Sequence, residues 1–201
     1  MTPREVEEYR ALRATIRERG SQRVVLFLVA IVAWAAATIA TAALAALPVA
    51  TLLPLLVLAS GFEAVFAVHT GVERIGRYLQ VFYGDEGTRE WERATMAYGR
   101  AFRGGGPDAL FTNYFYFATV LNFIPVLLAE PVRLEVAVVG TVHLFFVVRI
   151  FLAHRSAARQ RGVDLERFER IKEAGGLGKA GGTGGAEGAG NAGGAGVAGP
   201  E

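Results

Sequence analysis

The sequence predicts an all-α integral membrane protein with four transmembrane helices arranged as two hairpins, together with amphipathic cytoplasmic helices. No charged side chain occurs between Val24 and Phe62. A helix needs about 20 apolar residues to cross the hydrocarbon core, so this run is long enough for two crossings. A second predominantly apolar stretch follows at 110–153. With 52% apolar residues and a positive mean hydropathy, the composition is unusual for a soluble domain.

The chain begins with a helix-start signal. Thr2–Glu5 fits a capping box with proline at the first helical position, and apolar residues then recur at helical spacing up to Ile16. We predict an amphipathic helix over Pro3–Arg19 that ends or loosens at Gly20. It would lie on the membrane or against other cytosolic helices, or form a solvated leader. The apolar run that follows is too long for a cleaved signal peptide, which carries 7–15 apolar residues.

Pro48 divides the first apolar run, because proline stops or kinks a helix. The predicted spans are Val24–Leu47 and Val49–Val68, and the second helix is expected to continue through Gly71–Tyr83 into the cytosol. A row of small side chains along one face lets two helices approach closely in lipid. The abundance of alanine in the first span explains such a row equally well. The first span carries such a row at four-residue spacing, consisting of Ala33, Ala37, Thr41 and Ala45.

The central loop contains aromatic residues at three- and four-residue spacing, with arginines on the other faces. This pattern is typical of a helix at the level of the lipid headgroups. Packing on the extended second helix explains it equally well. The candidates for contact with the lipid surface are Trp91, Arg93, Tyr98, Arg100 and Phe102.

The second hairpin is predicted from an apolar stretch with an aromatic start, as in an interfacial belt. Span three covers 110–129 and includes Pro125, and span four covers 134–152. Beyond His154 a helix is expected to stop at Gly162, with Asp164 capping a short amphipathic piece. From Ala174 onward the composition collapses to glycine and alanine, which predicts disorder.

The predicted organisation has six parts, and charge gives their topology. The N-terminal segment and the central loop each carry six Lys or Arg, the segment beyond span four carries seven, and the two hairpin turns carry only Arg133. The positive-inside rule then places both termini and the central loop in the cytosol of a bacterial-type plasma membrane with an anionic inner leaflet. The parts are the N-terminal amphipathic helix (1–23), the first transmembrane hairpin (24–69), the cytoplasmic helical loop (70–109), the second hairpin (110–153), the cytoplasmic extension (154–173) and the disordered tail (174–201).

Four polar residues in the spans are the candidate functional residues, because ionisable groups at membrane depth are costly and are usually functional or paired. At 1.5 Å per residue, Glu63 and Arg149 lie about 9 Å and about 8 Å from the cytosolic ends of their spans. Asn122 and His143 both lie about 17 Å deep. The sequence thus offers two pairs at matched depth. We favour staples inside a four-helix bundle, with a polar path for a proton or ion as the alternative.

No pattern predicts an enzyme, a metal site or a cofactor. The chain lacks cysteine, a Gly-x-Ser-x-Gly elbow and a His-Glu-x-x-His pair. Gly175–Ala180 fails as a phosphate loop, since Ala180 stands where a serine or threonine should hold the metal. His69 and Glu73 are spaced to share a metal ion, but a surface hydrogen bond is the favoured interpretation.

The leading functional hypothesis is therefore a non-enzymatic scaffold or regulator. It would act through its basic cytoplasmic helical face on a protein partner or a second copy of itself. Because the basic residues lie beside the spans, they indicate anionic lipid rather than nucleic acid. The alternative is a small oligomeric proton or ion channel or transporter that uses Glu63 and His143.

Overall fold

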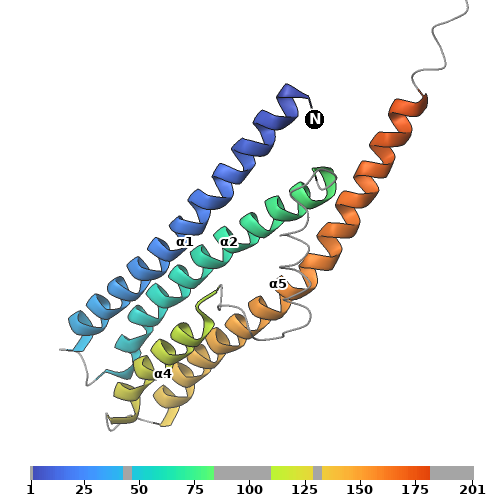
Figure 1. Cartoon of the computed structure of the whole chain (residues 1–201). Helices are drawn as coiled ribbons and strands as arrows, with labels where there is room; N and C mark the ends of the chain where they lie inside the picture. Colours follow the sequence, from blue (N-terminus) through green and yellow to red (C-terminus); the bar gives the residue numbers. More distant parts are fainter. Residues whose placement is uncertain (1, 43–46, 84–109, 129–132, 182–201) are drawn as a thin grey trace, which may run out of the picture.

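The computed structural model describes residues 2–42, 47–83, 110–128 and 133–181, and every regular element within these ranges is helical (Figure 1). This confirms the all-α prediction for the part of the chain described. In chain order the elements are α1 (Pro3–Ala42), the short 3-10 helix η1 (Pro48–Thr51), α2 (Leu52–Phe82), α4 (Thr112–Leu128) and α5 (Arg133–Gly181).

Three of these helical segments are long and apolar enough to cross a membrane: α1, η1 continuing into α2, and α5. Predicted span three corresponds to α4, which is apolar but has only 17 residues. At 1.5 Å per residue it is about 25 Å long, less than the roughly 30 Å of the hydrocarbon core. The structure therefore supports a membrane protein with three candidate spans.

Helix α1 is one continuous rod of 40 residues. The predicted capping box is confirmed, since the Thr2 amide donates to Glu5 Oε2 at 2.7 Å and the Glu5 amide donates to Thr2 Oγ1 at 3.3 Å. The predicted break at Gly20 is wrong. A glycine inside a helix costs only about 1 kcal/mol relative to alanine, too little to end a helix that continues into a long apolar run.

Helices α2 and α5 both run well beyond their apolar stretches. The predicted continuation of the second helix is confirmed, because α2 ends at Phe82. The predicted stop at Gly162 and cap at Asp164 are wrong, because α5 passes both residues and ends at Gly181. Asp164 is a buried residue inside the helix, bonded to α2. The segment predicted to be disordered begins at Ala174, but its first residues, up to Gly181, belong to α5, so the prediction is wrong for them. Residues 182–201 lie outside the described residues.

The helices pack α1 on α2, α2 on α5 and α4 on α5 (Figure 1). The start of α1 and the ends of α2 and α5 lie at the same end of the molecule, and α4 lies near the opposite end. Phe62 stands at the centre of the core, with the rings of Phe115 and Phe146 edge-on to it at 5.3 Å and 6.1 Å. Leu58 and Ile150 are fully buried in the same cluster.

Helices α1 and α2 come closest where Ala30 faces Gly61. A Cβ atom added at Gly61 would lie 2.3 Å from the Cβ atom of Ala30, so only glycine fits there. Ala30 is the one buried residue of α1, while the members of the predicted row that fall within the described residues are half-buried. The large apolar side chains of α1 from Val24 to Ile39 are mostly exposed, as expected for a helix that faces lipid.

Candidate functional site

The buried residue Asn122 of α4 connects its helix to three other elements, α1, η1 and α5. Its Oδ1 accepts a hydrogen bond from Trp34 Nε1 at 3.2 Å. Its Nδ2 donates to the Thr51 carbonyl at 2.9 Å and to His143 Nε2 at 3.1 Å. Asn122 is 2% exposed, so its bonds to α1, η1 and α5 are made away from solvent. The depth-matched pair Asn122 and His143 is brought together in the structure.

The partners of His143 assign its protonation. Nδ1 lies 2.8 Å from the Val139 carbonyl, which can only accept, so Nδ1 carries the proton. Nε2 is then the acceptor for the Asn122 amide. The ring also lies edge-on to Phe123 at 5.0 Å. Both nitrogens of this neutral imidazole are engaged, so a second proton on Nε2 would meet an N–H donor.

The second predicted pair is also brought together. Arg149 Nη2 donates to Glu63 Oε2 at 2.7 Å, and the Arg149 guanidinium lies 5.2 Å from the centre of the Phe66 ring. In contrast to the Asn122 bonds, this ion pair is on the outer surface, with side chains 41% and 46% exposed. No hydrogen bond among the described residues connects Glu63 to His143. The two pairs are separate features.

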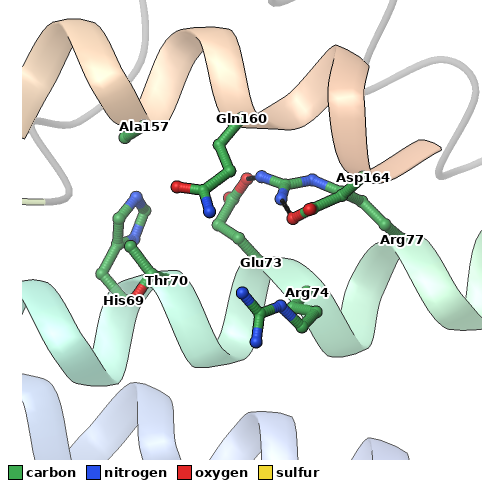
Figure 2. Close-up of a pocket in the computed structure, with 8 residues that line it drawn as sticks. All are labelled: His69, Thr70, Glu73, Arg74, Arg77, Ala157, Gln160 and Asp164. Atoms are coloured by element: carbon green, nitrogen blue, oxygen red, sulfur yellow. Dashed lines mark hydrogen bonds and ion pairs between the residues drawn. The ribbon is translucent and has the colours of Figure 1, made fainter. Parts of the chain in front are cut away.

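A third polar cluster lies beyond the apolar stretches, between the extensions of α2 and α5 (Figure 2). Arg77 donates from Nη1 to Asp164 Oδ2 at 2.6 Å and from Nη2 to Glu73 Oε2 at 2.8 Å. Arg161 Nε donates to the same Glu73 oxygen at 3.1 Å. Two arginines thus alternate with two carboxylates. Arg77 and Asp164 are 8% and 6% exposed, so this central pair is buried.

The cluster leaves little room for a ligand. The cavity beside it is lined by His69, Thr70, Gln160 and Ala157 together with the charged residues (Figure 2). Its volume is about 10 Å³, enough for a single water molecule. With matched charges and no space for a substrate, the geometry fits a clamp that holds α2 and α5 together.

Two further contacts connect α1 to α2 outside the apolar run. Arg23 Nη1 lies 3.2 Å from His69 Nδ1, and Arg23 Nε is buried without a hydrogen-bond partner in the described part of the chain. Farther out, the Tyr78 hydroxyl donates to Glu8 Oε1 at 2.9 Å. The pKa of the Tyr78 hydroxyl is raised above its usual value, mainly by burial and to a lesser extent by this bond to Glu8.

Sequence reasoning missed the clamp because Asp164 was interpreted as a helix cap. The rise of 1.5 Å per residue also places residues beyond the apolar runs: Arg77 lies about 12 Å beyond His69 on α2, and Asp164 about 15 Å beyond His154 on α5. These similar distances could have predicted the contact between Arg77 and Asp164 from the sequence. The lipid-surface candidates Trp91, Arg93, Tyr98, Arg100 and Phe102 all lie outside the described residues, so their placement stays a prediction.

No protein-family model matches the chain, and comparison with curated proteins and with solved structures gives no match. Within the described ranges, no group of three or more His, Asp or Glu side chains is arranged to hold a metal ion. Function is therefore inferred from the residues themselves.

Proposed function

We propose that this chain is a non-enzymatic membrane scaffold or regulator, which acts on a protein partner or a second copy through the helices that project from its apolar part. The observation that carries the proposal is the common direction of three projecting helices (Figure 1). Beyond the apolar runs, α1 extends about 30 Å, α2 about 20 Å and α5 about 40 Å. Bonds between them keep these extensions aligned as one surface.

The membrane arrangement is part of the proposal. Four spans in two hairpins, with both termini in the cytosol, would put all three extensions beside the anionic leaflet. A reporter that is active only outside the cytosol should give signal when fused at Pro48 or Pro131, and none when fused at Gly105 or Gly182. Signal at Gly105 would overturn the four-span arrangement, because the central loop would then lie on the other side.

A charge-swap experiment tests the scaffold role. Arg10 and Arg17 are exposed on α1, lie seven residues apart on one face, and have no ion-pair partner in the described part of the chain. We expect affinity purification from native membranes to recover the same specific partner, or second copy, with the wild type and with Arg10→Lys/Arg17→Lys. The variant Arg10→Glu/Arg17→Glu should lose it. Recovery of the same partner with all three proteins would contradict a role for Arg10 and Arg17 in partner binding.

A flux assay separates the scaffold from the channel hypothesis. Purified protein in proteoliposomes should conduct no protons or monovalent ions above the level of empty liposomes. The reason is that His143 uses both ring nitrogens in bonds within the bundle. Flux that is abolished by Glu63→Gln, with folding intact, would overturn the scaffold proposal in favour of a conductor.

A further inference from the structure

The first turns of α5 beyond the apolar run carry two arginines at the level of the headgroups. The apolar run ends at His154, and α5 continues without a break. Arg155 and Arg159 therefore lie about 1.5 Å and about 7.5 Å beyond it along the helix axis. The headgroup layer of each leaflet is about 5–8 Å thick, so both guanidinium groups can reach lipid phosphates.

These two arginines differ from other arginines of the same helix. Arg149, Arg161 and Arg170 each bond a carboxylate of the chain. Arg155 and Arg159 are exposed and have no carboxylate partner among the residues that the structure describes. The Arg155 guanidinium lies 4.5 Å from the centre of the Phe151 ring, which holds it against the helix without neutralising it. Two positive charges are left for an external anion.

The surface around them combines a polar upper part with an apolar lower part. A hollow of about 470 Å³ is lined by Leu152, Arg155, Ser156, Arg159 and Val163, with Arg167 at its far end. Val148, Leu152, Arg155 and Arg159 recur at three- and four-residue spacing, so they share one helix face. Val148 and Leu152 are 42% and 53% exposed. This face offers a contact for acyl chains directly below the two charges.

We propose that Arg155 and Arg159 form a binding site for the phosphate of an anionic phospholipid, whose acyl chains lie along Val148 and Leu152. Phosphate is the matching anion, because guanidinium groups bind phosphate oxygens with two parallel hydrogen bonds. The apolar strip on the same face favours a lipid over free phosphate. The site rests on the proposed membrane arrangement, and it gives the anionic leaflet a defined point of contact.

The test is a titration of the full chain, purified and stripped of lipid in neutral detergent, with phosphatidylglycerol and native mass spectrometry as the readout. The test variant is Arg155→Gln/Arg159→Gln. The control Arg4→Gln/Arg10→Gln removes the same charge from exposed positions of α1, about 30 Å and about 20 Å beyond the apolar run. At about tenfold per 1.4 kcal/mol and about 1 kcal/mol for each basic residue near the lipid surface, we expect the test variant to bind about 30-fold more weakly.

The control should retain the wild-type affinity, and inorganic phosphate at millimolar concentration should not displace the lipid. Equal weakening in both double variants, or wild-type affinity in the test variant, would overturn the site. Displacement by inorganic phosphate alone would overturn the lipid as its ligand. The melting temperatures of both variants should match the wild type, which excludes misfolding as the cause. Since detergent exposes both ends of the protein, this result does not depend on the reporter fusions that test topology.

Discussion

The buried ion pair between Arg77 and Asp164 allows the sharpest test of how α2 and α5 are held together. Removing one partner of a buried pair leaves an uncompensated charge and costs about 3–5 kcal/mol. Arg77→Met should reach the upper end of that range, because it strands a carboxylate that is 6% exposed. Asp164→Asn should fall near the lower end, because Arg77 keeps Glu73 as a partner at 2.8 Å.

The double variant Arg77→Met/Asp164→Asn should recover much of the loss, since it leaves no orphaned charge. We expect a coupling free energy of at least about 2 kcal/mol between the two sites, well above the additivity error of about 0.5 kcal/mol. The matched control is the exposed pair Arg170 and Glu166 on the same helix. Its removal by Arg170→Gln should cost less than about 0.5 kcal/mol.

The assay is unfolding in a mild detergent, followed by circular dichroism with increasing temperature and with increasing denaturing detergent. For a chain of this size, a loss of 1 kcal/mol corresponds to about 2–4 °C in melting temperature. The single variants should therefore melt about 6–20 °C below the wild type. Strictly additive losses in the double variant, or an Arg77→Met protein as stable as Arg170→Gln, would refute the clamp.

Three other predictions follow from the same contacts. Asn122→Leu removes the hydrogen-bond partner of the half-buried Trp34 and Thr51 and of the buried His143. At about 1–3 kcal/mol for an unsatisfied buried group, the melting temperature should fall by several degrees; an unchanged midpoint would contradict the network. Gly61→Ala should destabilise the protein by about 1–3 kcal/mol through overpacking, whereas Gly162→Ala, with open space around it, should stabilise it by up to about 1 kcal/mol. Glu63→Gln and Arg149→Met should each lower stability, and the double variant should regain part of it; independent effects would instead mean that Arg149 snorkels to the headgroups.

The polar pairs were the part of the bundle that the sequence predicted best. The depth of each polar residue in the membrane was enough to predict its partner. A charged or amide side chain in lipid has few possible partners, and its partner must lie at the same depth. The structure joins Glu63 to Arg149 and Asn122 to His143. Their functional role stays a prediction, because a bond between two side chains is compatible with either a staple or a path.

Helix boundaries and the tightest helix contact were predicted less well. Gly162 looked like a stop because local propensity was all that the sequence offered, whereas in the fold Asp164 is held against Arg77 across α2 and α5. In the same way, the row of small residues in the first span did not reveal the contact of Ala30 with Gly61. That contact depends on the relative rotation of two helices, which neither sequence alone determines.

The clamp has a consequence for how the two halves of the chain find each other. Helices α2 and α5 run in the same direction side by side (Figure 1). Polar contacts join them at several levels. Lipid tails are as apolar as the side chains that face them, so apolar contact alone selects no register between two inserted helices. A slide of one helical turn, about 5.4 Å, would break every polar contact at once. The contacts that thereby select a single register during assembly are Arg149 with Glu63, Arg161 with Glu73, Asp164 with Arg77, and Lys172 with the Val81 carbonyl.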